Sequence, residues 1–600
     1  MSTNDGLPTV SSQPRPRPTS NADLGFQRRK AVRWFDPPAL LRAGAKVALS
    51  GALGNYLDKR ELQATSPASV IDDFAGNGLN TEELWVDFLA DTGDGFNPTY
   101  TVAWQVSQPT LTVNGRELSR GSLLVLGGDE VYPTASPEEY ENRCLGPFRA
   151  ALPFTEPDVD GRHPALLAVP GNHDWYDGLT SFVRMFTQQR WIGGRRTLQT
   201  RSYFAVRLPH RCWLWGVDIE SEAYLDSTQI SYFRAAAEHM RADDRLILCT
   251  AKPCWTERVP SGRARNLAFV ERELVPPGVK IVLTLTGDSH HYVRYESPDA
   301  TSHKVTAGGG GAFLSATHVL PKTVDVLDHQ AAPGIGATGM GGTGIGATLK
   351  REYEQRVVYP TASRSRRLSF RAALIGLRNR RFAAVPAVVG WLLFSASVSG
   401  LRLGDQRSMK EASVDWGLFD LLLGDLRSPQ TALTIGLLAV ALILFAKPRP
   451  LEQKSTAIAA RVAMGLLHAV MQVFAAAGVS VQALRLAGGL PEGRVFDVGA
   501  ALLAAGLSAI VGSMVMGLYL VLFVLFGHHD NEAFSAFRHE GYKNFLRMRI
   551  HRDGIEVFAI GIERTVSSWA FNGSATDPSA SWMRPIAVPT LQLIDHFTAS

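Results

Sequence analysis

The hydrophobic pattern of the chain changes character near its middle. From about residue 82 to 315, short apolar runs alternate with mixed stretches, a pattern typical of strands alternating with helices in a layered α/β domain. After residue 381 the chain contains long uncharged apolar runs instead. About 20 apolar residues are enough for a helix to cross a hydrocarbon core about 30 Å thick. The sequence therefore predicts an α/β domain followed by membrane-spanning helices.

Charges beside the apolar runs predict how the spans are oriented. The segment 363–381 carries seven arginines and no acidic residue, and basic loops then alternate with nearly neutral ones. Because basic loops stay on the cytoplasmic side, we expect both chain ends and the α/β domain to be cytoplasmic, at an inner or plasma membrane. The second run is the shortest and also fits a buried helix. The four runs are residues 382–401, 429–446, 462–484 and 498–527.

A chain of 600 residues is too long for one hydrophobic core, and these patterns divide it into five parts. The first 30 residues are rich in proline, serine and arginine and contain no apolar signal-peptide core, so we expect a disordered tail. The five expected parts are that tail (1–30), the α/β domain (31–350), a basic juxtamembrane segment (351–381), about four transmembrane helices (382–527) and a cytosolic C-terminal region (528–600).

Overall charge and cysteine content narrow the class of protein. The formal net charge of +5 is small for this length, so we expect no nucleic-acid partner. The four cysteines fit no common zinc spacing. Free thiols in a reducing compartment are the simpler expectation, with two disulfides as the alternative.

Four polar clusters follow four apolar, strand-like runs in the first half of the chain. Each alone is a weak signal in a sequence with 55 glycines, but their order and placement are informative. The carboxyl ends of adjacent strands are where open α/β sheets collect their ligands. Together the clusters resemble, with some departures, the metal-binding motifs of a two-metal phosphoesterase. They are ADTGDG (90–95), GGDEVYP (127–133), GNHD (171–174) and GDSHHY (287–292).

On these clusters the chain resembles the calcineurin-like metallophosphoesterases. The motifs GNHDWYDGL, GGGGAFLSATHV and NEAFSAF are similar to those of a membrane-anchored branch of this family in bacteria and plants. The resemblance implies a four-layer α/β/β/α sandwich followed by an all-α membrane domain. It also implies hydrolysis of a phosphate mono- or diester, with two divalent metal ions and a metal-bound hydroxide as the nucleophile.

The resemblance also assigns metal ligands in this chain. Asp91 corresponds to a ligand of the first metal, and Asp129 to the carboxylate that bridges both metals. Asn172 corresponds to a ligand of the second metal. His290 corresponds to the last histidine of the family's final motif, on the first metal.

Two further residues receive catalytic roles from the resemblance. His173 corresponds to the histidine that faces the phosphate, where it stabilises charge or protonates the leaving oxygen. Asp174 is expected to orient His173 by accepting its other ring N–H. Tyr132 flanks a ligand position, where packing is the simpler expectation.

The chain departs from the family at three positions. Gly93 stands where the first motif normally has a histidine, and Asp94 is expected to reach the metals instead. Asp288 replaces a histidine ligand of the second metal. Ala251 occupies the place of another histidine, with Lys252 beside it as a source of positive charge near the phosphate. The oxygen-rich ligand set favours manganese, iron or magnesium over zinc.

Three functions fit these observations. The leading one is a membrane-anchored phosphoesterase whose partners are a phosphoester substrate and the lipid bilayer. The second is a non-catalytic metal-binding membrane sensor or scaffold with a degenerate site, which the alanine at position 251 favours. The third is a transporter or channel regulated by its soluble half; the scarcity of charged residues in the spans weakens it.

Overall fold

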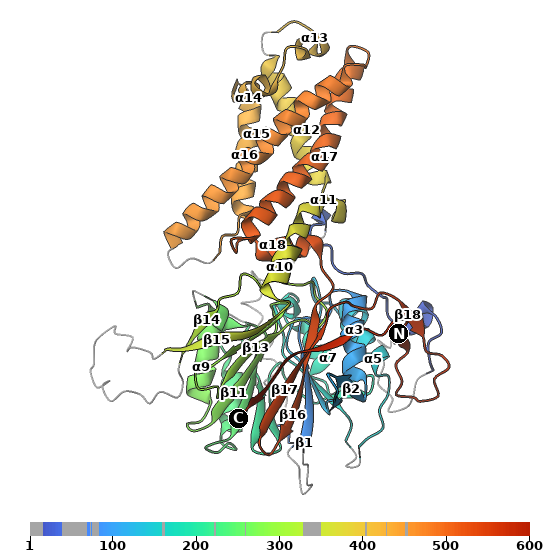
Figure 1. Ribbon diagram of the computed structural model, residues 1–600, viewed down its shortest axis with the longest axis vertical. Coiled ribbons are helices and arrows are strands. Elements are labelled where there is room, and N and C mark those ends of the chain that lie inside the picture. The colour runs from blue at the N-terminus through green and yellow to red at the C-terminus, as the bar shows by residue number, and fades with distance from the viewer. Residues whose placement is uncertain are drawn as a thin grey trace, which may run out of the picture. The chain divides into compact units, whose positions relative to one another are not determined.

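The structure is a computed structural model that describes most of the chain (Figure 1). The chain divides into two compact units, each described separately below. Residues 1–15 of the expected tail lie outside the described residues. The described ranges are 16–38, 69–72, 74, 83–158, 162–220, 224–257, 260–327, 350–402, 405–427, 429–449 and 454–600.

The first unit contains two eight-stranded sheets, and the first sheet is built around β1 (Glu83–Leu89). Six of the seven residues of β1 are buried, as expected for a central strand covered on both faces. β1 pairs in parallel with β4 and antiparallel with β16. In spatial order the sheet contains β20 (Leu591–Ala599), β17 (Gly554–Ile562), β16 (Lys543–His551), β1, β4 (Leu123–Leu126), β5 (Ala165–Ala168), β7 (Arg195–Thr197) and β6 (Trp191–Ile192).

The second sheet is mixed, with β11 (Lys280–Thr286) near its centre. β11 pairs in parallel with both β10 and β13, so the carboxyl ends of these three strands lie at one edge. In spatial order the sheet contains β14 (Thr323–Leu327), β15 (Lys350–Tyr359), β12 (Tyr292–Glu296), β13 (His303–Ala307), β11, β10 (Arg245–Cys249), β9 (Cys212–Gly216) and β8 (Phe204–Leu208). Two short hairpins, β2–β3 (Thr110–Val113, Arg116–Ser119) and β18–β19 (Trp569–Phe571, Met583–Pro585), lie outside both sheets.

Each large sheet packs against helices of its own. One apolar core joins the first sheet to helices that follow β1, β4 and β5, and another joins the second sheet to helices that follow β9 and β10. This helical cover on both sheets is the arrangement of a layered α/β domain. The principal helices are α3 (Phe96–Ser107), α4 (Pro137–Tyr140), α5 (Gly146–Ala151), α6 (Asn172–Trp175) and α7 (Thr180–Phe186) on the first side, and α8 (Ser227–Ala237) and α9 (Gly262–Phe269) on the second.

The C-terminal part of the chain differs from its expected place as a separate region, 528–600. Residues 540–600 belong to the first unit, where β16, β17 and β20 complete the first sheet (Figure 1). β15, expected in the juxtamembrane segment, likewise lies in the second sheet. The physical reason is burial: residues on both faces of β16 and β17 are buried, so these strands need neighbours to cover them. The helical unit is therefore an insertion between two parts of one α/β domain.

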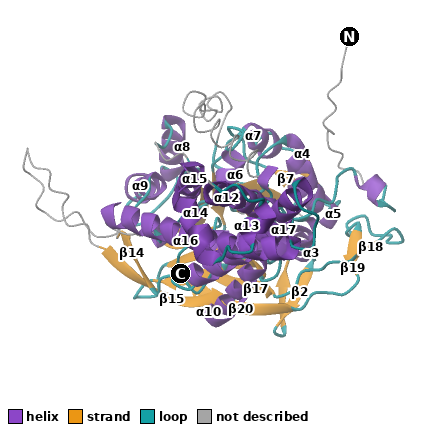
Figure 2. Cartoon of the chain, turned by 90° about the horizontal axis from the view of Figure 1, so that it is seen from above, coloured by secondary structure: helices purple, strands orange, loops and turns teal. Residues whose placement is uncertain are grey.

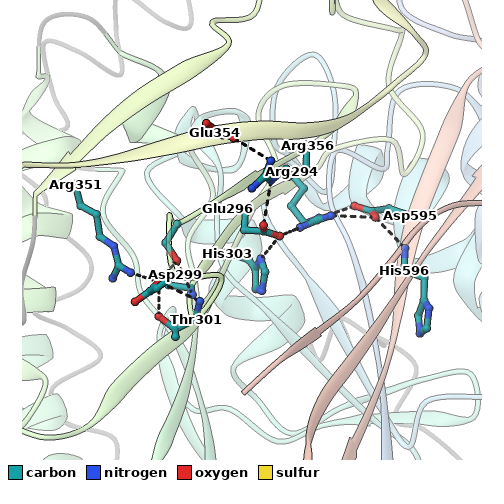
Figure 3. A network of polar contacts seen from close by, with 12 residues as sticks. Arg294, Glu296, Asp299, Thr301, His303, Arg351, Glu354, Arg356, Asp595 and His596 are labelled. Atoms are coloured by element: carbon teal, nitrogen blue, oxygen red, sulfur yellow. Dashed lines mark hydrogen bonds and ion pairs between the residues drawn. The ribbon is translucent and has the colours of Figure 1, made fainter.

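Polar contacts tie the last strand, β20, to the second sheet (Figure 3). The Arg294 Nε atom donates to Asp595 Oδ2 at 2.7 Å, and the Tyr292 hydroxyl donates to the same oxygen at 2.7 Å. A second guanidinium nitrogen of Arg294 reaches Glu296, 2.5 Å away on the same strand. Charged and polar groups thus join the last strand of the first sheet to the second sheet.

The second unit is helical, and the described strands all belong to the first unit (Figure 2). Within the described residues, three helices are long and apolar enough to cross a membrane: Ala384–Leu401, Ser455–Ala487 and Arg494–Val524. A fourth apolar helix, Pro429–Phe445, is shorter. The unit contains α10 (Ala362–Ser369), η6 (Phe370–Leu374), α11 (Ile375–Arg378), α12 (Ala384–Leu401), α13 (Met409–Ser413), α14 (Leu418–Arg427), α15 (Pro429–Phe445), α16 (Lys454–Ala487), α17 (Arg494–Val524) and α18 (Asp530–Phe537).

Small residues bring α12 and α17 into close contact. A Cβ atom added at Gly390 would stand 2.0 Å from the Ser508 hydroxyl, and one at Gly512 would stand 2.6 Å from the Pro386 Cβ atom. Close approach through small residues is typical of helices packed in a membrane, where apolar burial alone does not drive association.

Candidate functional site

Each of the four polar clusters follows the carboxyl end of a strand. β1, β4 and β5 are neighbouring parallel strands of the first sheet, and their clusters carry Asp91, Asp129 and Asn172. β11 belongs to the second sheet and leads to Asp288 and His290. The expected strands are therefore present, and their polar ends come from both sheets.

Hydrogen bonds show that the clusters meet in space. The Asp91 N–H donates to the Gly128 carbonyl at 2.9 Å, which links the first two clusters. The Asp288 N–H donates to Asp91 Oδ1 at 3.2 Å, and the His173 N–H donates to Asp129 Oδ1 at 2.8 Å. The fold thus gathers residues separated by almost 200 positions.

Three of the gathered aspartates have left-handed backbones. The φ angles of Asp91, Asp129 and Asp288 are 59°, 54° and 61°. Such angles are uncommon outside glycine, and strained backbones cluster at functional sites when the surrounding structure holds them. Three equivalent turns therefore aim three carboxylates from the ends of three strands.

Glycines let the backbone approach these carboxylates closely. A Cβ atom at Gly171 would stand 2.2 Å from Asp129 Oδ1, and one at Gly308 would stand 2.3 Å from Asp91 Oδ2. Any other residue at either position would displace a carboxylate oxygen. The glycines of GNHD and of the loop after β13 consequently shape the site.

Tyr132 lies among the gathered side chains, although the sequence pattern favoured packing for it. Its hydroxyl oxygen is 2.9 Å from Asp91 Oδ1, 3.3 Å from Asp129 Oδ2 and 3.1 Å from His290 Nε2. A phenol has one proton, so it donates to one carboxylate while its lone pairs face the other. A cation at this point would relieve that arrangement. The sequence contained one signal for this role of Tyr132: a tyrosine three residues after Asp129, in a chain whose first cluster has no histidine.

The backbone closes the place of that missing histidine. A Cβ atom at Gly93 would stand 2.2 Å from the Glu130 carbonyl oxygen, so no side chain fits there. Asp94 does not take its place, because Asp94 Oδ1 accepts a hydrogen bond of 2.7 Å from the Val32 N–H. Burial raises the pKa of Asp94 to about 6. Asp94 therefore fixes the N-terminal segment against the sheet, contrary to its expected role at the metals.

His173 has a defined hydrogen bond at one ring nitrogen. His173 Nδ1 lies 2.7 Å from the Pro133 carbonyl oxygen, which can only accept, so Nδ1 carries a proton. Burial lowers the pKa of His173 to about 4, so the ring is neutral near pH 7. In the neutral ring Nε2 then has a lone pair. Asn172 lies beside it, and its Nδ2 donates to the Tyr176 hydroxyl at 2.9 Å.

Asp174 accepts hydrogen bonds from backbone N–H groups of the site. The hydrogen bond to the His173 ring, which was expected from Asp174, is made by the Pro133 carbonyl instead. Its Oδ2 atom accepts from the Gly171 N–H at 2.9 Å and from the Glu130 N–H at 3.3 Å. Its Oδ1 atom accepts from the Tyr140 hydroxyl. Asp174 thereby joins the second and third clusters.

The gathered carboxylates repel one another. Burial, and then the charge of Asp288, raises the pKa of Asp91 well above its ordinary value. Burial, and then the charge of Asp91, raises that of Asp129, while buried Lys543 offsets part of the charge at Asp91. Asp91 Oδ2 and His290 Nδ1 are buried polar atoms without a hydrogen-bond partner. A divalent cation would supply the missing positive charge.

The donors present fit such an ion, although they do not form a preformed cage. Among the described residues, no group of three or more His, Cys, Asp or Glu side chains is arranged to hold a metal ion. The Tyr132 hydroxyl oxygen, a further candidate metal ligand, lies within hydrogen-bond distance of both Asp91 and His290. Burial lowers the pKa of His290 to about 3, so the ring is neutral and able to ligate.

Ala251 occupies the third position at which the chain differs from the expected motifs, and it is buried. Gly128 packs against it: a Cβ atom added at Gly128 would stand 2.7 Å from the Ala251 Cβ atom. Burial lowers the pKa of Lys252, but the carboxylates of Asp288, Glu257 and Glu220 together raise it overall. Lys252 therefore stays cationic in the field of a candidate ligand.

None of the four cysteines forms a disulfide bond. All four cysteines are free and buried: Cys144, Cys212, Cys249 and Cys254. The sequence matches no family model and no curated protein, so the geometry above carries the functional argument.

Proposed function

We propose that the protein is a membrane-anchored, metal-dependent phosphoesterase that hydrolyses a phosphate mono- or diester. The observation that carries the proposal is the convergence of Asp91, Asp129 and His290 on the Tyr132 hydroxyl, with the Asp288 N–H bonded to Asp91 Oδ1. Asp91, Asp129 and Asp288 have left-handed backbones, and the carboxylates of Asp91 and Asp129 are buried. Such an arrangement is costly unless a cation binds it.

The donors divide into two proposed metal sites. Asp91, His290 and Tyr132 would hold the first ion, and Asp129 would contribute to both sites. Divalent ions there would lower the pKa of a coordinated water and polarise the phosphoryl oxygens. Asn172 and Asp288 would hold the second ion, more weakly because Ala251 supplies no ligand. The abundance of oxygen donors favours manganese, iron or magnesium over zinc.

His173 acts on the leaving oxygen in this proposal. The Pro133 carbonyl fixes the proton on Nδ1, which leaves Nε2 to take up a proton and pass it on. Lys252 adds positive charge on the side of Asp288, where the charge of the phosphate would lie. The four-layer α/β/β/α sandwich is the proposed fold family of the first unit, and its two helix-covered sheets support it.

Connectivity supports four membrane crossings. Thr361 and Glu540 belong to the same folded unit, so the chain enters and leaves the membrane on one side. The number of crossings between them is then even. Three helices are long enough, and the 17-residue α15, roughly 26 Å long, is the natural fourth. The arginines of 363–381 favour the cytoplasmic face for the first unit.

A non-catalytic sensor or scaffold is the second candidate. It is favoured by Ala251, which removes a ligand, and by the closed position at Gly93. In that case the carboxylates would hold one ion for structure alone. The two proposals differ in what happens to a substrate.

Hydrolysis of chromogenic phosphomonoesters and phosphodiesters by the purified full-length protein tests the enzyme. We expect turnover with Mn²⁺, Fe²⁺ or Mg²⁺ that Asp129→Asn abolishes and His173→Ala lowers about 10²–10⁴-fold. Asp94→Asn is the matched control, because that buried carboxylate binds Val32 and should leave metal binding unchanged. Metal binding without turnover in the wild-type protein would support the scaffold.

A further inference from the structure

The segment Ala362–Arg381, called here the basic segment, has a surface that the phosphoesterase proposal does not use. It contains α10, η6 and α11, and it precedes the apolar helix α12. Phe370, Leu374 and Leu377 are 55%, 47% and 75% exposed. Their spacing of four and three residues places them on one face of a helical segment. An exposed apolar stripe of this kind indicates an interaction surface.

The opposite face of the basic segment packs against α17 of the same helical unit. Its Ala372 and Ile375 are fully buried. A Cβ atom at Gly517 of α17 would stand 2.8 Å from the Ala372 carbonyl oxygen, and one at Gly376 would stand 2.8 Å from the Ser513 Cβ atom. The backbones therefore touch, and the orientation of the exposed stripe is determined.

The contact with α17 places the stripe at one end of a long apolar helix. α17 has 31 residues and is roughly 46 Å long, which exceeds a hydrocarbon core of about 30 Å. Gly517 lies seven residues before its last residue, Val524, or roughly 10 Å along the axis. That depth corresponds to the boundary between acyl chains and headgroups. An amphipathic segment there lies in the plane of the membrane surface.

The charge of the basic segment identifies what it faces. Its seven arginines have no acidic residue among them. Arg381 pairs with Asp36 at 3.2 Å and Arg378 donates to the Phe537 carbonyl, so these two have local partners. The side chains of Arg366, Arg367, Arg371 and Arg380 are exposed. Exposed guanidinium groups bind phosphate oxygens well, often through two parallel hydrogen bonds.

We propose that the basic segment is a binding surface for anionic phospholipid headgroups. Phe370, Leu374 and Leu377 enter the outer part of the acyl region, and the neighbouring arginines bind headgroup phosphates. The surface recognises the lipid around the protein, independently of what the metal site hydrolyses.

Lipid retention by the full-length protein tests the charge. Protein in detergent is mixed with equal amounts of phosphatidylglycerol and phosphatidylcholine, and the lipids retained are counted by native mass spectrometry. We expect phosphatidylglycerol to be retained at least about five-fold better, since one arginine near an anionic surface is worth about that factor. The triple variant R366Q/R367Q/R371Q should lose the preference. The matched control R207Q/R234Q/R241Q removes three exposed arginines of the first unit and should keep it.

A second measurement tests the depth of the apolar stripe. Because all four native cysteines are buried, Phe370→Cys can be labelled selectively with a polarity-sensitive dye. In nanodiscs containing phosphatidylglycerol we expect a blue-shifted emission at position 370. A label at Ile586→Cys, which is 70% exposed in the first unit, should report water. Equal retention of both lipids, or a water-like emission at position 370, would overturn the proposal.

Discussion

Arg547 and Asp87 form a fully buried ion pair between strands that are 460 residues apart in the chain. Nε of Arg547 is 2.7 Å from Asp87 Oδ1, and a second guanidinium nitrogen is 3.1 Å from Asp87 Oδ2. The remaining donors reach the carbonyls of Leu118 and Val106. The pair thus fastens the C-terminal strand β16 to β1, the strand that leads into the candidate site.

Removing Arg547 should be costly because it leaves the buried Asp87 carboxylate without its ion-pair partner, with the Gly121 N–H still donating to Oδ2. We expect Arg547→Met to lower the free energy of unfolding of the first unit by about 3–5 kcal/mol. The same two strands offer a control in Arg549 and Glu83, paired at 2.8 Å with both side chains about 40% exposed. Arg549→Met should cost about 1 kcal/mol or less. Chemical denaturation followed by near-ultraviolet circular dichroism measures both, and equal losses would contradict the assignment.

Tyr132→Phe tests whether the phenol is a metal ligand. The ring should still pack, while the oxygen that contacts Asp91, Asp129 and His290 is lost. We expect affinity for Mn²⁺ to fall about 10–100-fold, an effect typical of losing a group that supports a metal site. Calorimetric titration measures it without reference to turnover. A visible absorption with ferric ion that is absent in Tyr132→Phe would identify a phenolate ligand, and unchanged affinity would rule the ligand out.

Placing a histidine at position 93 should fail. A Cβ atom there meets the Glu130 carbonyl oxygen at 2.2 Å, which is backbone and cannot move aside cheaply. We expect Gly93→Ala to destabilise the first unit by about 1–3 kcal/mol, in the range of overpacking, and Gly93→His by more. Gly178, which has no heavy atom near an added Cβ but has φ of +66°, provides a comparison for strain without a clash. Thermal unfolding is the measurement, and a stable Gly93→His variant with improved metal binding would disprove the closed position.

Glu220 should make stability depend on pH. Burial raises its pKa from 4.5 to about 7, although Arg263, 2.8 Å away, opposes the shift. The folded state therefore holds this proton more tightly than the unfolded chain does. The destabilisation is absent below about pH 4.5, grows as the pH rises to about 7, and reaches up to about 3 kcal/mol.

Glu220→Gln should flatten this part of the pH profile, because an amide has no proton to lose. The free energy of unfolding is compared at pH 4.5 and pH 8 in both proteins. A wild-type profile that is as flat as that of the variant would show that Glu220 titrates normally in the folded state.

The sequence predicted those features that local pattern controls. The apolar runs before the polar clusters form β1, β4, β5 and β11, and three of the apolar runs in the second half form long apolar helices. Because β1 and β4 are neighbouring parallel strands, the meeting of Asp91 and Asp129 followed from the pattern, whereas Asp288 reaches them from the second sheet.

Features that depend on distant contacts were not predictable in the same way. The pairing of β16 with β1 spans most of the chain, and no local period encodes it. Asp94 looked like a ligand by its spacing, but the N–H of Val32 takes its carboxylate. Tyr132 looked like a core residue, and only its neighbours across two sheets show where its hydroxyl lies.

The pairing of β16 with β1 also sets an order of events during synthesis. Every proposed ligand leaves the ribosome before the first apolar helix, yet the strand that flanks β1 is made after the last one. The first sheet cannot close until the helices between them have been translated. A first unit released before the helices were translated would lack that strand, so the proposed site is completed only after the helical segment has been made.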